Sequence, residues 1–218
     1  MTPITTSTYE VITFDCYGTL IDWETGIAVA FAEAGATADR ESILRAYAAV
    51  EPQVERQYRP YREVLQESAF RVSQMLGWPI AYERCDFLAR SLPQWQPFAD
   101  TNAALEQLGC RLGILSNIDD DLIARTLEHF TVAFDLVITA QQVRSYKPGR
   151  AHFDAARERL GATPWLHAAQ SNFHDVVPCN AIGIPTAWIN RRGEEALPGG
   201  TPTHEFRDLA GLAAARTG

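Results

Sequence analysis

The sequence lacks the segments that mark secretion or membrane insertion, and it has few cysteines. Its N-terminus shows no basic stretch followed by an apolar core, and no apolar run is long enough to cross a bilayer. The four cysteines, Cys16, Cys85, Cys110 and Cys179, are scattered without CxxC spacing, and a chain of 218 residues does not need disulfides. We therefore expect a cytoplasmic protein with reduced thiols.

A long cluster of lysine or arginine is also missing. The formal net charge is −8 at pH 7, which argues against nucleic acid or an anionic membrane as the principal partner. A local basic pocket remains compatible with that charge. We expect a small molecule as the main binding partner.

What the sequence does contain is enough apolar material for a substantial core, with 46% hydrophobic residues. Short apolar runs typical of buried strands alternate with helical patterns in the first 34 residues and again after Pro97, which predicts a parallel sheet with right-handed crossovers. The predicted strands are Val11–Phe14, Arg111–Leu115, Leu136–Thr139, His167–Ala169 and Thr186–Ile189. The helices predicted around them are Ile27–Ala34, Asp100–Leu108, Asp119–Phe130, Arg150–Leu160, Val176–Ala181 and Leu209–Ala215.

The stretch between Asp39 and Arg90 has no strand-like alternation. It shows three helical patterns separated by Pro52, Pro60 and the Gly77–Pro79 break. The predicted segments are Arg40–Arg56, Tyr61–Leu76 and Tyr82–Leu92. This pattern indicates a helical insertion into an α/β domain.

Polar residues follow four predicted strands at the points where the strands end. They are Asp15, the pair Ser116 and Asn117, Lys147, and the group Gln170, Ser171, Asn172 and Asp175. Each has an ordinary structural explanation, because Asp and Ser often cap helices and turns and lysine is usually solvated. Four such groups at one edge of one sheet instead favour a ligand site, since ligands of open α/β sheets bind outside the carboxyl ends of the strands.

These residues resemble the four motifs of the haloacid dehalogenase (HAD) superfamily. The matching segments, in order, are Asp15-Cys16-Tyr17-Gly18-Thr19-Leu20, Leu115-Ser116-Asn117, Tyr146-Lys147-Pro148 and Ser171-Asn172-Phe173-His174-Asp175. The segment Ile184–Arg191 resembles the one that follows the fourth motif in the 2-haloacid dehalogenase branch. The resemblance implies an α/β fold with a Rossmann-like core in residues 1–22 and 97–218 and an all-helical cap domain in residues 23–96. Homodimerisation is a further expectation from the family.

Tyr17 distinguishes between two activities of that superfamily. Its phosphatases carry a second Asp two residues after the nucleophile, which protonates the leaving alkoxide. Tyrosine, with an ordinary pKa near 10, is a poor substitute, whereas a halide leaving group needs no proton. The resemblance therefore implies a hydrolytic dehalogenase of small 2-haloalkanoic acids, with no cofactor and no metal.

The resemblance also implies roles for individual residues. Asp15 is the expected nucleophile that forms an aspartyl ester, Lys147 keeps it ionised, and Asp175 with Asn172 orients the water. Thr19 and the turn amides support Asp15. The residues expected to contact substrate or halide are Cys16, Tyr17, Ser116, Asn117 and Arg45.

Several positions leave alternatives open. Arg45 could instead be a solvated helix residue, and a one-residue shift would put Ala46 in the halide position. Gln170 and Phe153 depart from the residues usual in the dehalogenases, and for His174 we favour packing over contact with substrate. Trp23 and Tyr47 are the first aromatic candidates for ligand contact. The alternative functions are a Mg²⁺-dependent phosphatase and an inactive protein that binds a small acid or a protein partner.

Overall fold

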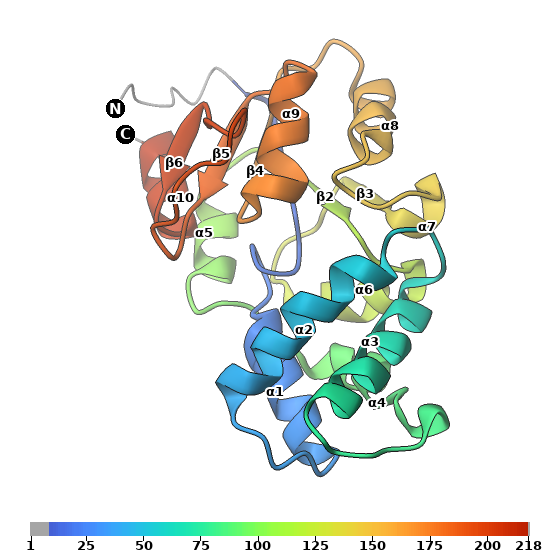
Figure 1. Cartoon of the computed structure of the whole chain (residues 1–218). Helices are drawn as coiled ribbons and strands as arrows, with labels where there is room; N and C mark the ends of the chain where they lie inside the picture. The colour runs from blue at the N-terminus through green and yellow to red at the C-terminus, as the bar shows by residue number, and fades with distance from the viewer. Residues whose placement is uncertain (1–8, 218) are drawn as a thin grey trace.

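The computed structural model describes residues 9–217, whose centre is a six-stranded parallel sheet (Figure 1). The strand order is β3-β2-β1-β4-β5-β6. The strands are β1 Val11–Phe14, β2 Arg111–Ser116, β3 Leu136–Thr139, β4 Trp165–Ala169, β5 Thr186–Ile189 and β6 His204–Phe206. The chain builds outward from β1 to β3 on one side and then crosses to β4 on the other, so the strand order reverses beside β1. Such a reversal is where ligands of open α/β sheets bind.

Both faces of the sheet are covered, which explains why its strands are apolar without polar alternation. Ile12 and Phe14 of β1 belong to one core cluster with Leu105 of α5 (Thr101–Gln107) and Leu212 of α10 (Leu209–Thr217). Val11, on the opposite face, belongs to a second cluster that includes residues of α8 (Ala151–Leu160) and α9 (Val177–Ala181). The sheet is therefore a rigid base from which the strand ends project.

The helices confirm the predicted alternation. The helices of the α/β part are α5 Thr101–Gln107, α6 Asp120–Thr126, α7 Ala140–Val143, α8 Ala151–Leu160, α9 Val177–Ala181 and α10 Leu209–Thr217. The helices of the insertion are α1 Trp23–Glu33, α2 Arg40–Val54, α3 Tyr61–Met75 and α4 Phe87–Ser91. Figure 1 shows α1 to α4 as a group at one end of the molecule, away from β4, β5 and β6. No helix within residues 9–217 has the length and apolar content needed to cross a membrane.

Three local predictions were incomplete. The segment predicted as one helix over Tyr82–Leu92 is broken into the 3-10 turn Tyr82–Arg84, the short α4 and a second 3-10 turn, Leu92–Gln94. Strand β6 and helix α7 were not predicted. Both are only three or four residues long, too short for a hydrophobic period to show in the sequence.

The helical cap leaves and re-enters the core at adjacent points. Ile21 pairs with Pro97 in an isolated antiparallel bridge, and the Asp22 amide donates to the Gln96 carbonyl at 2.9 Å. These contacts lie within a residue or two of the predicted boundaries of the cap domain. The precise limits of the two domains stay a prediction.

The core also contacts the cap at a second place, the start of α3. The carboxylate of Asp119 accepts hydrogen bonds from the backbone amides of Tyr61 and Arg62, at 2.8 and 3.0 Å, and so caps the N-terminus of α3. The Tyr146 hydroxyl donates to the Arg59 carbonyl at 2.5 Å. The cap is thus fixed over the carboxyl ends of β1 and β2, where it closes a cavity.

Candidate active site

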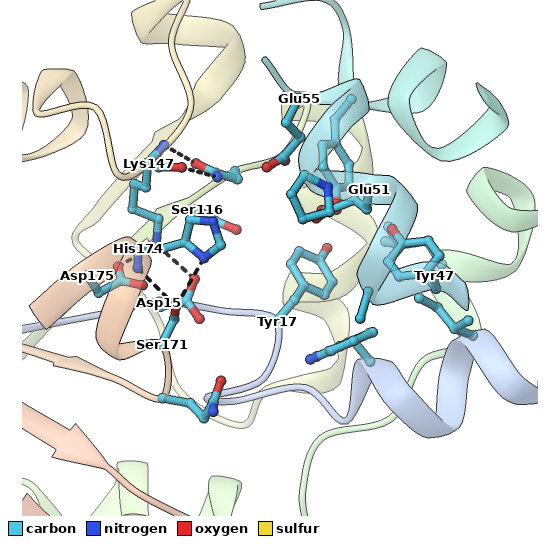
Figure 2. Close-up of a pocket in the computed structure, with 18 of the residues that line it drawn as sticks. Asp15, Tyr17, Tyr47, Glu51, Glu55, Ser116, Lys147, Ser171, His174 and Asp175 are labelled. Atoms are coloured by element: carbon cyan, nitrogen blue, oxygen red, sulfur yellow. Dashed lines mark hydrogen bonds and ion pairs between the residues drawn. The ribbon is translucent and has the colours of Figure 1, made fainter. Parts of the chain in front are cut away.

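A cavity of about 300 Å³ lies between the cap and the carboxyl ends of the strands. Its core side carries the polar residues that follow β1, β2 and β4, and its cap side is formed by α1, α2 and the start of α3 (Figure 2). Asp15, Ser116, Lys147 and Asp175 all line it. The parallel topology therefore brings together residues that are up to 160 positions apart in the chain.

Asp15 is held from both of its carboxylate oxygens. Its Oδ1 accepts from Lys147 Nζ at 2.8 Å, and its Oδ2 accepts from the Thr19 hydroxyl at 2.9 Å. Gly18 lies in the turn between Asp15 and Thr19 and has a φ of 102°, a conformation that favours glycine. The amides of Gly18 and Leu20 donate within the turn, to the Ile21 and Cys16 carbonyls, and so do not support Asp15. Support from the other amides of the turn stays a prediction.

Lys147 connects the carboxylates of Asp15 and Asp175. Its side chain is 1% exposed, and Nζ donates to Asp15 Oδ1, to Asp175 Oδ1 at 2.7 Å and to the Leu115 carbonyl at 2.8 Å. Burial alone would lower the pKa of this ammonium, but the two carboxylates raise it above its ordinary value. Lys147 therefore remains a cation throughout the neutral range.

The pKa values of Asp15 and Asp175 are shifted in opposite directions beside this cation. Burial raises the pKa of Asp15 above its ordinary value, and the charge of Lys147 opposes that rise. For Asp175, burial is outweighed by Lys147 and by a hydrogen bond with His167, so its pKa is lowered. Asp175 is thus a fixed anion and a weak base, whereas Asp15 is the carboxylate more readily protonated.

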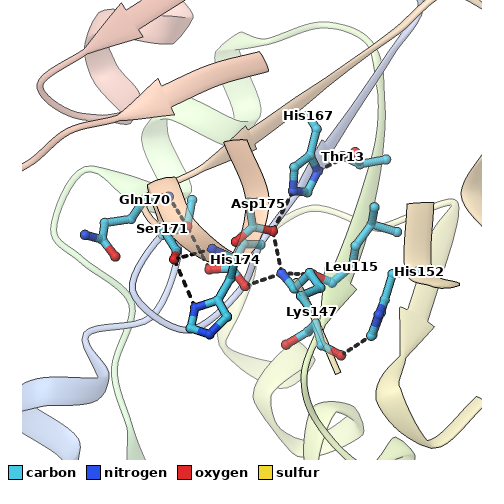
Figure 3. Close-up of polar contacts among 12 residues, drawn as sticks. Thr13, Leu115, Lys147, His152, His167, Gln170, Ser171, His174 and Asp175 are labelled. Carbon is cyan, nitrogen blue, oxygen red and sulfur yellow. Dashed lines mark hydrogen bonds and ion pairs between the residues drawn. The ribbon is translucent and has the colours of Figure 1, made fainter. Parts of the chain in front are cut away.

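A buried chain of contacts lies behind Asp175. His167 Nε2 is 2.9 Å from Asp175 Oδ1, and His167 Nδ1 is 2.9 Å from the Thr13 hydroxyl (Figure 3). Thr13 and His167 are fully buried on neighbouring strands. This chain fixes the position of Asp175, a residue that lines the cavity and whose buried Oδ2 has no hydrogen-bond partner among the described residues.

The cap side of the cavity is aromatic and acidic. Trp23, Tyr47, Tyr61 and Trp95 line it together with Glu51 and Glu55, as Figure 2 shows for the labelled residues Tyr47, Glu51 and Glu55. Tyr47, Glu51 and Glu55 are spaced by four residues, so they project from one face of the helix. Burial raises the pKa of both carboxyls, that of Glu55 to about 9 because Glu51 adds its charge.

The comparisons with known proteins assign the chain to a family. The sequence matches the haloacid dehalogenase-like hydrolase family over residues 9–166. The chain belongs to this family. A curated relative, (S)-2-haloacid dehalogenase 4A of Burkholderia cepacia, is 27% identical over 206 residues, which cover 90% of this chain and 87% of that protein. The (S)-2-haloacid dehalogenase of Pseudomonas putida is 32% identical over 121 residues, only 52% of this chain and 53% of that protein.

Solved structures show the same fold. The L-2-haloacid dehalogenase of Xanthobacter autotrophicus with chloropropionic acid covalently bound superposes with a TM-score of 0.81 at 21% identity, covering 94% of this chain and 97% of that one. This chain is therefore a haloacid dehalogenase-like hydrolase with a Rossmann-like core and a helical cap. Its substrate is a separate question, which depends on the cavity.

Most residues predicted for the site of this hydrolase lie at the cavity. Tyr17, Ser116 and Asn117 line it, and Thr19 reaches it through Asp15. Asn117 also holds Lys147 in place, because its side chain accepts from the Lys147 amide at 2.8 Å and donates to the Lys147 carbonyl at 3.1 Å. The roles of these residues in catalysis stay predictions.

Three predicted site residues lie elsewhere. Cys16 is fully buried in the same core cluster as Ile12 and Phe14 and does not line the cavity. Asn172 bonds to the Gly200 carbonyl and the Leu197 amide, so it holds a loop and does not line the cavity. Arg45 is 72% exposed and paired with Glu41. The expectation that Arg45 contacts the halide is therefore wrong.

His174 was expected to pack beside the helix start rather than to contact substrate, and which of the two it does stays a prediction. It lines the cavity, with Nδ1 3.0 Å from the Ser171 hydroxyl. Burial lowers its pKa below the ordinary value, so the imidazole is neutral at pH 7. Phe153, in contrast, is buried against the His167 ring, with centroids 5.3 Å apart.

The residues of the site do not fit a tightly bound divalent cation. Within residues 9–217, no group of three or more His, Cys, Asp or Glu side chains is placed to hold a metal ion. Mg²⁺ relies on carboxylate oxygens, and here the ammonium of Lys147 is hydrogen-bonded to both Asp15 and Asp175. Independence from a metal stays a prediction for experiment.

Proposed function

We propose that this hydrolase removes halide from small 2-haloalkanoic acids through an ester on Asp15. The observation that carries the proposal is that the hydroxyl of Tyr17 is buried and stays protonated. Its hydroxyl is 2.8 Å from the Thr126 hydroxyl, and burial raises its pKa well above the usual value. The residue two positions after Asp15 therefore holds its proton tightly and cannot act as the acid of a phosphatase. Displacement of a halide requires no such acid.

The first step needs an ionised nucleophile beside a substrate carboxylate. An Asp15 oxygen attacks the carbon that bears the halogen, the carbon–halogen bond breaks, and halide leaves with the bonding electrons. The cation of Lys147 favours the ionised form of Asp15. The Ser116 hydroxyl, buried at the cavity without a partner in the described part of the chain, is available to the substrate carboxylate.

The second step hydrolyses the ester. Water attacks the carbonyl carbon of Asp15, and the bond between that carbon and the ester oxygen breaks. One proton of the water goes to the leaving oxygen and the other to a base of the cavity, so the products are a 2-hydroxy acid and an Asp15 carboxylate that carries one oxygen from water. Asp175, whose Oδ2 has no other described partner, orients this water, and the neutral imidazole of His174 can accept its proton. The cleaved bond lies between the acyl carbon and the product oxygen, so oxygen from solvent enters Asp15.

Asp175→Asn should uncouple these steps. The asparagine oxygen can still accept from Lys147, while the contact of Oδ2 with water is lost, so halide release should show a burst near one equivalent per protein. Turnover should then fall by about a hundredfold or more, within the range of general base effects. Rapid-quench halide assays measure both phases. Asp154→Asn, at an exposed ion pair, is the control, and unchanged steady-state turnover in Asp175→Asn contradicts the role.

The function is tested by halide release from chloroacetate and 2-chloropropionate, with and without EDTA, beside a generic phosphatase assay. We expect release that is insensitive to EDTA and no phosphate release. Metal-dependent phosphate release would favour the phosphatase instead. No activity in either assay would favour a binding protein.

A further inference from the structure

The cap half of the cavity has acidic residues where a halide site was expected to have a cation. Four carboxyl groups line the cavity, those of Asp15, Glu51, Glu55 and Asp175, and Lys147 is the one Lys or Arg among the described residues that line it. Asp15 and Asp175 both pair with Lys147. No described ion pair involves Glu51 or Glu55, so their end of the cavity has no counter-charge from the protein.

One oxygen at this end is also unpartnered. Glu51 Oε1 accepts from the Tyr61 hydroxyl at 3.1 Å. The Glu51 and Glu55 carboxyls are hydrogen-bonded to each other, while Glu55 Oε1 is inaccessible to solvent and has no hydrogen-bond partner among the residues described. A buried polar atom without a partner is costly, and in a ligand cavity it indicates a contact that the ligand supplies. Once these carboxyls are ionised, their oxygens can only accept, so the group that satisfies them carries N–H or O–H.

The walls around the two carboxyls suit a cation. The rings of Trp23 and Tyr47 lie 5.8 Å apart, and those of Tyr17 and Trp95 lie 6.0 Å apart in an edge-to-face arrangement. All four residues line the cavity. The faces of such rings attract ammonium groups, most strongly where water is excluded. Carboxylates and aromatic faces together favour a cation over a neutral alcohol or an anion.

The volume is consistent with a substrate that reaches both ends. About 300 Å³ is roughly ten times the ~30 Å³ that one water molecule occupies in the liquid. That space exceeds the needs of a haloacid of two or three carbons. A longer chain attached to the reacting carbon can therefore extend from Asp15 to the cap.

We propose that Glu51 and Glu55, within the aromatic walls of the cap, bind a protonated amine of the substrate. Resting on the function proposed above, the substrate class is a 2-haloacid whose chain ends in an ammonium group. Without an amine, the raised pKa of Glu55 keeps a proton on its carboxyl, which is hydrogen-bonded to Glu51. The ammonium displaces that proton and becomes the missing counter-charge.

The test measures the cation subsite without turnover. Isothermal titration calorimetry compares n-butylammonium with n-butanol, a neutral ligand of nearly the same shape. We expect n-butylammonium to bind at least about tenfold more tightly, as a charge-assisted hydrogen bond and ring contacts predict. Glu55→Gln should reduce this ratio to near one while n-butanol still binds, which shows that the cavity remains folded. Glu51→Gln should reduce it less.

Glu41→Gln is the matched control, because Glu41 lies on the same helix with its side chain 84% exposed. It should leave the ratio unchanged. Equal binding of the two ligands to the wild type, or tighter binding of butyrate, would overturn the cation subsite. Halide release from 2-chloropropionate is measured separately. If it is absent while n-butylammonium is selected, the subsite stands and the proposed function fails.

Discussion

Asp15→Asn is expected to abolish halide release, with a loss of at least about a thousandfold in kcat, as removal of a nucleophile predicts. The amide cannot form the ester, although it keeps the size of the carboxylate and can still accept from Lys147. Because the geometry is retained, substrate binding should change less than turnover. Steady-state halide assays over a range of 2-chloropropionate concentrations separate kcat from KM.

The control for this variant is Asp154→Asn, which removes a carboxylate whose ion pair with Arg150 is exposed. It should retain turnover within about twofold, as surface substitutions away from such a site do. Turnover in Asp15→Asn at a level comparable with the wild type would refute the covalent route. A large rise in KM with little change in kcat would instead make Asp15 a binding residue.

Lys147→Met should have the largest effect on stability. Removing one partner of a buried ion pair leaves an uncompensated charge and costs about 3–5 kcal/mol, and here two carboxylates lose the same partner. Halide release should also disappear. Urea unfolding measures the change in the free energy of unfolding. Arg45→Met, which removes an exposed cation from the cap, should change it by no more than about 0.5 kcal/mol and should leave halide release unchanged.

The pH dependence of the Lys147→Met deficit has a defined sign. In the wild type the pKa of Asp175 is lowered, so its contribution to stability is present above the unfolded pKa and is lost as the pH falls through the folded pKa. Without the cation, burial raises the pKa of Asp15 and Asp175, and the folded variant then binds more protons than the unfolded chain. The deficit should therefore be smaller at pH 5 than at pH 8. A deficit that grows on acidification would contradict the assigned charges.

The chain offers a direct probe of this cation, because Lys147 is its only lysine. Every other basic side chain is arginine or histidine. Selective isotope labelling of lysine therefore gives an NMR signal from the site alone. Its raised pKa means that the signal should show no titration between pH 6 and pH 10.

The core of the molecule could be predicted because its strands are buried on both faces. A short run as apolar as Val11–Phe14 is typical of a strand buried on both faces. The position of Asp15 follows from where that run ends. Parallel pairing then brings the remaining strand ends to the same edge. The arrangement of Asp15, Lys147 and Asp175 thus depends on order and spacing, which the sequence contains.

The cap could not be read in the same way. A helix on the surface and a helix over a cavity have the same period, so the sequence does not show which polar residues face inward. Arg45 and Glu51 lie on one helix, yet the first is in solvent and the second lines the cavity. The spacing of Tyr47, Glu51 and Glu55 was the available signal. It gained meaning only when the position of α2 was known.

Asn172 shows a second reason why the site could not be fully predicted from the sequence. It follows a strand end in the motif of the family, but its side chain packs on Gly200 and holds the loop before β6. That loop is distant in sequence and has no regular pattern, so nothing in the motif revealed the contact. His167 was likewise interpreted as part of a strand, although it supports Asp175 from behind. Residues that act through a neighbour are recognised from contacts, which only the folded chain shows.

The central claim is that Asp15 forms an ester with the substrate carbon. It is tested most directly by a turnover in water enriched in oxygen-18, followed by digestion and mass spectrometry of the peptide that contains Asp15. The account predicts that the label appears in the Asp15 carboxylate, while the hydroxyl of the first product carries ordinary oxygen. Label found only in the product, with none in Asp15, would mean that water attacks the substrate directly and would contradict the account.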